Sequence, residues 1–303
     1  MPESYTHVRT ARRALKKAEL TVSNWAAFDC GANGPDMLFC YRIWRSAEKR
    51  GENLPELGSR LHRENTGVFL RTLIQNAHTP GEKSYVLGFL SHYAADRTVH
   101  PYIAFLSADG QPYAGTGGHG YSEIAIDSEL HQRDTGRRGI TVNENVPKLT
   151  GTERAAVGAL LQKGIQAALG VAVSQKALED TFRHTRWLRR WFCSPCRILY
   201  GIFWLAEPFF GGRSFITCHI TPAKLKELPG RWNDPYTGKM RDEDLNTLLE
   251  QAEQWSADYM KAVQDYWNGK SSMDKLSGLL GSASYDSGLE DAQSAPAEQP
   301  DTM

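Results

Sequence analysis

The sequence predicts an all-α protein. Most of the chain carries apolar residues at helical spacing, short segments rich in glycine, proline and asparagine separate these stretches, and long apolar runs alternating at period two are scarce. The 303 residues, of which 41% are hydrophobic and 23% charged, are typical of a globular protein with one large domain or two ordinary ones. The 35 basic residues balance the 35 acidic residues, so no overall charge attracts nucleic acid or an anionic surface.

Three turn-rich segments divide the first half of the chain. CGANGPD separates two helical stretches, HTPGEK separates the next two, and the glycine-rich loop ADGQPYAGTGGHG precedes YSEIAIDSELH. Between these breaks we expect helices at residues 8–28, 37–50, 58–76, 83–106 and 121–131. Pro101 is expected to kink the fourth of them, because proline removes a hydrogen bond from the helix backbone.

The second half of the chain is also mainly helical. Thr152 and Gly170 are suitable capping residues for the apolar-periodic stretch that lies between them. A helix is expected at residues 174–191, which begin with the capping residue Ser174 and end with several arginines. Residues 242–269 form a long amphipathic stretch and predict a further helix.

The stretch SHYAADRTVHPYI, residues 91–103, places His92, Asp96 and His100 four residues apart. In an α-helix these side chains project from one face, and the apolar residues around them would draw that face into a core. Burying such polar groups is costly unless they are paired or coordinate a metal. The pattern therefore predicts either a metal site or a buried polar network.

A second pair of candidate ligands, His119 and Glu123, lies four residues apart in HGYSE. Neutral imidazole and carboxylate are the groups that bind zinc when cysteine is absent, and five such residues between positions 92 and 123 favour the metal interpretation. Ordinary core or surface polar residues remain the alternative. Asp127 and His131 continue the spacing, either as partners of the ligands or, as we expect, on an exposed helix face.

These motifs resemble the zinc-dependent phospholipase C family, whose all-α fold is shared with the S1/P1 nucleases. The family motif is L-x-H-Y-x-x-D with a nearby histidine, followed by H-x3-E on the next helix. GFLSHYAADRTVH and HGYSE match it through His92, Tyr93, Asp96, His100, His119 and Glu123.

The resemblance implies further ligands and two or three zinc ions. By their order in the chain, Asp36 in GPD and His62 in RLH match an upstream aspartate and histidine, and His7 matches an N-terminal histidine. One ion would take Asp36, His62, His92 and Asp96. Its neighbour would take His100, His119 and Glu123. A third would be bound by His7 and shared through Asp96.

The implied activity is hydrolysis of a phosphodiester, with a phospholipid as the first choice of substrate. Two zinc ions about 3.5–4 Å apart would activate a water for in-line attack on phosphorus. The resemblance makes Asp36 the catalytic residue that orients or deprotonates this water. Two alternatives stay open: a single-strand nuclease of the same fold, and a non-catalytic metal-stabilised protein that binds a membrane or a partner. No specific nucleic acid partner is predicted.

The aromatic segment at residues 187–210 follows a cluster of arginines. Its apolar run is interrupted by prolines and charges, so it is too broken for a transmembrane helix. A basic edge beside aromatic rings is typical of peripheral membrane contact. We favour the alternative that the segment forms a helical pair packed over the rest of the protein.

The chain is thus expected to have three regions. Residues 1–150 form the metal-binding region, residues 151–269 form a helical extension packed on it, and residues 270–303 form a disordered tail because Ser, Gly, Ala, Asp and Pro dominate there. The start of the sequence lacks the apolar segment of a secretory signal, so we expect a cytoplasmic protein whose five cysteines stay reduced. This expectation includes possible peripheral contact with a membrane.

Overall fold

The computed structural model describes residues 4–290, except for 210–211, 213 and 215, and confirms the all-α class. The α-helices are α1 (Ser4–Lys17), α2 (Trp25–Gly31), α3 (Leu54–Leu61), α4 (Thr66–Asn76), α5 (Pro80–Ser107), α6 (Gly118–Thr135), α7 (Val142–Asn145), α8 (Gly151–Leu169), α9 (Gln175–Phe192), α10 (Ile198–Ala206), α11 (Leu245–Trp267) and α12 (Met273–Leu280). The 3-10 helices are η1 (Gly34–Cys40), η2 (Ala47–Lys49), η3 (Glu207–Phe209) and η4 (Thr217–His219). The strands β1 (Trp232–Asn233) and β2 (Met240–Arg241) pair antiparallel, with Trp232 opposite Arg241.

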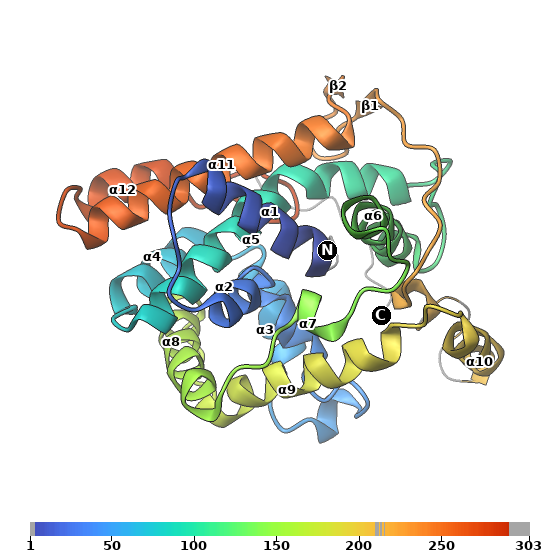
Figure 1. Ribbon diagram of the computed structural model, residues 1–303, viewed down its shortest axis with the longest axis horizontal. Coiled ribbons are helices and arrows are strands. Elements are labelled where there is room, and N and C mark those ends of the chain that lie inside the picture. The colour runs from blue at the N-terminus through green and yellow to red at the C-terminus, as the bar shows by residue number, and fades with distance from the viewer. Residues whose placement is uncertain (1–3, 210–211, 213, 215, 291–303) are drawn as a thin grey trace.

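Helix α5 is central to the fold and contacts α1, α2 and α11 (Figure 1). It begins with a capping box, in which Thr79 Oγ1 accepts the N–H of Glu82 and the Glu82 carboxylate accepts the N–H of Thr79. Most of its residues between Ser84 and Ile103 are buried. Because little of this helix faces solvent, its polar side chains must find partners inside the protein.

The main hydrophobic core joins helices from both halves of the sequence. Its members include Val8, Phe28, Phe89, Phe182 and Tyr285. A second cluster forms where Trp232 of the hairpin packs edge-on against Tyr102 of α5, beside the start of α11. Residues before and after position 150 therefore share one core.

Three of the expected helices differ from the prediction because single residues break them. Residues 8–28 form α1 and α2, separated near Glu19, whose φ is 57°. Residues 37–50 are not an α-helix but two 3-10 segments with Arg42, at φ 47°, between them. Residues 58–76 belong to α3 and α4, which are divided at Asn65, at φ 50°. Left-handed backbone of this kind cannot continue an α-helix.

The expectation of a disordered tail is wrong for residues 270–290. Helix α12 forms there with Ser272 as its N-cap, and Ala283 and Tyr285 are fully buried beyond it. The apolar side chains Leu276, Leu280 and Tyr285 provide the burial that offsets the entropy of ordering a polar segment. Residues 291–303 lie outside the described residues.

Within the described part of the chain, no helix combines the length and the apolar character needed to cross a bilayer.

Candidate metal centre

The three polar residues of α5 lie on one buried stripe, as their spacing predicts. His92 Nε2 is 2.9 Å from Asp96 Oδ2, and His100 Nε2 is 3.7 Å from Asp96 Oδ1. All three side chains are at most 5% exposed. Asp96 therefore lies between two imidazoles, one helical turn before it and one after it.

Asp36 and His62 approach the same carboxylate from a different part of the chain. Asp36 lies on η1, and His62 is the C-cap of α3. His62 Nε2 is 3.0 Å from Asp36 Oδ1 and 3.7 Å from Asp96 Oδ2. Gly34, at φ 51°, permits this approach, because a Cβ there would lie 2.1 Å from Cδ2 of His92.

His7 reaches the centre from α1. Its Nε2 is 3.3 Å from Asp96 Oδ1, and its ring centroid is 4.2 Å from that of His92. His7, Asp36, His92 and Asp96 each offer one ligand atom, and these four atoms lie within 4.8 Å of one another. The structure thus brings the most N-terminal candidate to the same point as the residues of α5.

A second group forms where α6 faces the C-terminal half of α5. His119 Nε2 is 3.0 Å from Glu123 Oε1, one turn along α6, and His100 Nε2 is 3.8 Å from the same oxygen. One ligand atom from each of these three residues lies within 4.8 Å of the others. All eight residues predicted from the sequence therefore gather in two adjacent groups.

Backbone carbonyls determine which nitrogen of three histidines faces the centre. The Nδ1 atoms of His62, His92 and His100 lie 2.7, 3.2 and 3.1 Å from the carbonyl oxygens of Gly58, Ala32 and Tyr285, respectively. A carbonyl oxygen can only accept a hydrogen bond, so each Nδ1 must carry the proton. In a neutral imidazole, Nε2 then presents a lone pair, which is the arrangement of a histidine that binds a metal.

Several buried atoms at the centre have no hydrogen-bond partner among the residues described. They are Nδ1 and Nε2 of His7, Nε2 of His92, both carboxylate oxygens of Asp96 and Nε2 of His100. Buried polar atoms are rarely left in this state unless an ion or a water satisfies them. Imidazole nitrogen and carboxylate oxygen are both zinc ligands, so these residues fit a zinc site.

The electrostatics of the centre favour neutral His7 and His100 beside an ionised Asp96. Burial lowers the pKa of His100 well below its ordinary value and also lowers the pKa of His7. Burial alone would raise the pKa of Asp96, but His100, His92 and His7 outweigh it, and the pKa lies well below the usual range. Neutral imidazoles and ionised carboxylates are the forms that bind a metal cation.

His62 differs from His7 and His100, because its pKa is raised and not lowered. Burial alone would lower its pKa, but the hydrogen bond and the charge of Asp36 raise it to about 9. Burial alone would raise the pKa of Asp36, but the neighbouring imidazole of His92 and the same pairing with His62 outweigh it and lower the pKa of that carboxyl. Without a metal, His62 and Asp36 therefore form a charged pair at neutral pH.

The interpretation of Asp127 and His131 as an exposed helix face is wrong, because both are buried. Asp127 accepts the N–H groups of Tyr5 and Thr6 at the first turn of α1, at 3.0 and 2.9 Å. These bonds hold the helix that carries His7. His131 lies within hydrogen-bond distance of the Arg137 carbonyl and of Glu144.

Sequence reasoning missed Tyr285 and Asp286. The Tyr285 carbonyl accepts from His100, and Asp286 Oδ1 lies 3.8 Å from Nδ1 of the same histidine. The one signal available was a tyrosine within an otherwise small and polar stretch, SASYDSG.

The two groups differ in exposure. The Asp36 side chain is 12% exposed and the His119 side chain 48%, whereas the other six candidates are at most 5% exposed. Among the eight candidate ligands, His119 is therefore the one most exposed to solvent, and it marks the open end of the centre.

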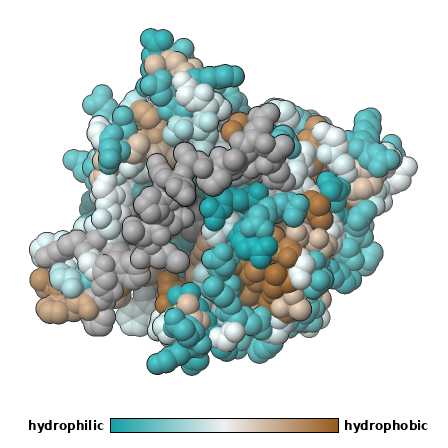
Figure 2. Space-filling model, turned by 180° about the vertical axis from the view of Figure 1, so that it is seen from behind, coloured by the Kyte–Doolittle hydropathy of each residue, from teal (hydrophilic) through white to brown (hydrophobic). Residues whose placement is uncertain are grey.

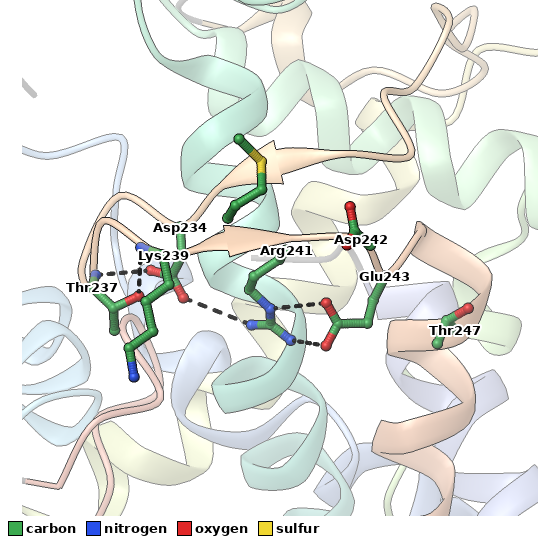
Figure 3. Close-up of a pocket in the computed structure, with 8 residues that line it drawn as sticks. Asp234, Thr237, Lys239, Arg241, Asp242, Glu243 and Thr247 are labelled. Carbon is green, nitrogen blue, oxygen red and sulfur yellow. Dashed lines mark hydrogen bonds and ion pairs between the residues drawn. The ribbon is translucent and has the colours of Figure 1, made fainter.

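A separate polar pocket lies at the β1–β2 hairpin (Figure 3). Arg241 lies between Asp234 and Glu243, with Nη1 3.7 Å from Asp234 Oδ2 and Nη2 3.1 Å from Glu243 Oε1. None of the eight candidate ligands lines this pocket. Its central charges pair with one another, so we do not assign it to the candidate site.

Comparison with known proteins identifies one family. The family model for zinc-dependent phospholipase C matches residues 6–164, which is more than half of the chain and includes all eight candidate ligands. No curated protein and no solved structure matches the sequence significantly.

Proposed function

Because the chain belongs to the zinc-dependent phospholipase C family, we propose that it hydrolyses a phosphodiester bond of a phospholipid at a zinc site formed by the two groups. The observation that carries this proposal is the cluster of buried, unpartnered ligand atoms around Asp96. Carbonyl acceptors on Nδ1 leave Nε2 of His92 and of His100 facing the centre, where each can bind a cation.

The proposed ligands follow from the two groups. We propose Asp36, His62, His92 and Asp96 as the ligands of one ion, and His100, His119 and Glu123 as the ligands of a second. The distance of 3.3 Å between His7 Nε2 and Asp96 Oδ1 supports a third ion, shared through Asp96. We therefore propose two or three zinc ions.

Zinc in such a site supplies a Lewis acid that lowers the pKa of water towards neutrality and offsets the charge of phosphoryl oxygens. Asp36 is the proposed catalytic residue, since it is the carboxylate of the first group with a solvent-accessible edge. Its lowered pKa keeps it ionised at neutral pH, so it can accept a hydrogen bond or a proton from water. Six of the other ligands, all except His119, are buried, and the low dielectric around them strengthens the electrostatic interactions in the site.

Attack at phosphorus would break the bond to the glycerol oxygen. The products would be a phosphorylated headgroup and a diacylglycerol. Asp36, having taken the proton of the attacking water, would have to return one to solvent or to the leaving oxygen before the next turnover.

The exposure of the aromatic segment, residues 187–210, supports the proposal that the substrate is a membrane lipid. α9 packs on the core, as expected, but the expectation that the whole segment is packed is wrong, because α10 has no buried residue. Large apolar side chains exposed here include Trp187, Trp191, Ile198, Ile202, Leu205 and Phe209. Apolar surface is visible at the lower left of Figure 2, where the half-turn from Figure 1 brings α10. Such exposure in one segment is typical of a lipid or protein contact.

Charge favours an anionic bilayer as the surface that this segment meets. Arg183, Arg190 and Arg197 are exposed, and the one acidic residue between positions 183 and 209, Glu207, is buried. Glu207 is used internally, where it accepts the N–H groups of Ile216 and Thr217. Exposed aromatics flanked by arginines match the headgroup region of a membrane.

The segment also lies beside the open end of the centre. The ring of Phe192, at the end of α9, stacks on His219 with centroids 6.0 Å apart. A Cβ on Gly120, next to His119, would lie 3.0 Å from Cε1 of His219. A bilayer resting on α10 would therefore be close to the exposed ligand His119.

The test is hydrolysis by the zinc-loaded full chain of three substrates: phosphatidylcholine vesicles, vesicles that also contain phosphatidylglycerol, and single-stranded DNA. We expect release of phosphorylated headgroup, loss of this activity in Asp36→Asn, and retention in Asp242→Asn, a change at an exposed carboxylate of the hairpin. Cleavage of DNA alone would favour the nuclease, and zinc retained without cleavage of any substrate would favour a non-catalytic role.

A further inference from the structure

One residue near the end of the described chain joins the two proposed metal positions through its backbone. The N–H of Tyr285 donates to the carbonyl of His62 at 2.7 Å, and the carbonyl of Tyr285 accepts from Nδ1 of His100 at 3.1 Å. His62 belongs to the first group and His100 to the second. A displacement of Tyr285 would therefore affect a histidine in each.

The side chain of Tyr285 packs against the same centre. Its ring centroid lies 5.2 Å from that of His62, 5.8 Å from that of His92 and 5.0 Å from that of Tyr93. The next residue, Asp286, places its carboxylate oxygens 3.8 Å from His100 Nδ1 and 3.9 Å from Arg63 Nε. These contacts restrict the orientation of imidazoles that would otherwise rotate.

Residues 281–290, which we call the C-terminal strap, are held on α4 and α5 by specific bonds. Thr66 Oγ1 donates to the carbonyl of Ala283 at 2.9 Å, and the N–H of Ala283 donates to Tyr93 Oη at 3.1 Å. Further along, Gly288 lies against the carbonyl of Arg97, the position that Pro101 leaves without its helical donor. A Cβ on Gly288 would be 2.4 Å from that oxygen, and φ is 70°, so this approach requires glycine.

We infer that the C-terminal strap positions His62 and His100 for metal binding, so that it sets the zinc affinity of the centre and does not merely add to the stability of the fold. The inference rests on the proposed function, since it concerns the same zinc site. Residues that orient metal-binding histidines typically change metal affinity by about 10- to 100-fold when they are lost.

The first test compares two shortened chains. A chain ending at Leu280 keeps α12 and loses the strap, whereas a chain ending at Glu290 keeps both and serves as the control. Zinc dissociation constants would be measured by competition with a chromophoric chelator, and circular dichroism would establish that both chains are folded. We expect the chain ending at Leu280 to bind zinc at least about tenfold more weakly, while the control equals the full chain.

A second pair of variants covers the case in which the shorter chain does not fold. Gly288→Ala forces the strap away from Arg97, whereas Gly238→Ala, in the hairpin, has a similar φ of 66° and no neighbour within 4 Å of the added Cβ. Both changes strain the backbone, but only the first acts at the strap. We expect Gly288→Ala alone to weaken zinc binding and to change the nitrogen-15 NMR signals of His62 and His100, which report the protonated ring nitrogen.

The outcomes separate this inference from the proposed function. A full chain that binds no zinc would overturn both. A full chain that binds zinc, with equal affinity in the folded strap variants and unchanged histidine signals, would overturn the role of the strap and leave the proposed zinc site intact.

Discussion

His92 Nε2 lies 2.9 Å from Asp96 Oδ2, yet the two atoms are not aligned for a hydrogen bond. Nδ1 of His92 lies 3.2 Å from the carbonyl of Ala32, which fixes the proton on the far side of the ring. Nε2 of His92 and Oδ2 of Asp96 then face each other as two lone-pair atoms. Two such atoms held this close in a buried site repel each other unless both bind the same cation. The pair is therefore best explained as two ligands of one ion.

Replacing Asp96 tests this explanation most directly. Asp96→Asn keeps the shape of the side chain but removes the charge that faces four histidines, so we expect zinc content to fall in both groups. The measurement is metal content by mass spectrometry after dialysis, with circular dichroism as the check on folding. Asp242→Asn, at a side chain that is 77% exposed, is the control. Unchanged zinc in folded Asp96→Asn would contradict the ligand role.

The spacing of the residues on α5 and α6 was sufficient to predict which candidate ligands share a face of each helix. His92, Asp96 and His100 share a face because a helix repeats every 3.6 residues, and the same rule pairs His119 with Glu123. Local periodicity determines these neighbours, whatever the rest of the fold does. The assignment of Asp36, His62 and His7 needed the family resemblance, since residues on separate segments have no period in common.

Contacts made by irregular segments could not be predicted in the same way. Tyr285 reaches the centre because a polar segment folds back over α5, and composition alone indicated disorder there. Asp127 lies four residues after Glu123 on α6, but its carboxylate bonds to the first turn of α1. That contact depends on how the two helices pack. In each case a hydrogen bond across more than 100 positions of sequence decides the role of the residue.

The pH dependence of the metal-free protein provides a second test. The pKa of His62 is about 9 in the folded protein and 6.5 for the free side chain, so the folded state holds the proton more tightly. The resulting stability, about 3 kcal/mol, is fully present below pH 6.5 and is lost as the pH rises through 9. Urea denaturation of chelator-treated protein at these two pH values measures it.

Zinc should change this pattern, because a metal bound at His62 Nε2 displaces the proton. Zinc affinity should therefore increase between pH 7 and pH 9, and zinc binding at pH 7 should release a proton to the buffer, which calorimetry in two buffers detects. His62→Asn should remove both effects. A flat affinity over this range would show that His62 is not a ligand.

Asp127 should stabilise α1 through its two backbone acceptor contacts. Asp127→Ala leaves the N–H groups of Tyr5 and Thr6 without this acceptor, at an expected cost of about 1–2 kcal/mol in the free energy of unfolding. Hydrogen exchange at these two amides should quicken more than exchange in α11. Glu129→Gln, which alters an exposed acid of α6 that pairs with Arg133 on the same helix, is the control. Equal exchange in the two variants would contradict the anchoring role.

The proposed membrane contact can be tested with two tryptophans of equal exposure. Trp191, at the end of α9, and Trp255, on α11, are each 46% exposed, but only Trp191 lies in the segment that leads to α10 (Figure 1). Insertion of an aromatic ring at the headgroup level contributes on the order of 1.5–3 kcal/mol. We therefore expect Trp191→Ala to reduce binding to phosphatidylglycerol-containing vesicles by about tenfold or more, as measured by cosedimentation, and Trp255→Ala to have no effect.

Binding should also weaken with added salt, because salt screens the attraction between the arginines beside the rings and the anionic lipids. Equal losses in both variants, or none in either, would argue against this segment as the membrane contact.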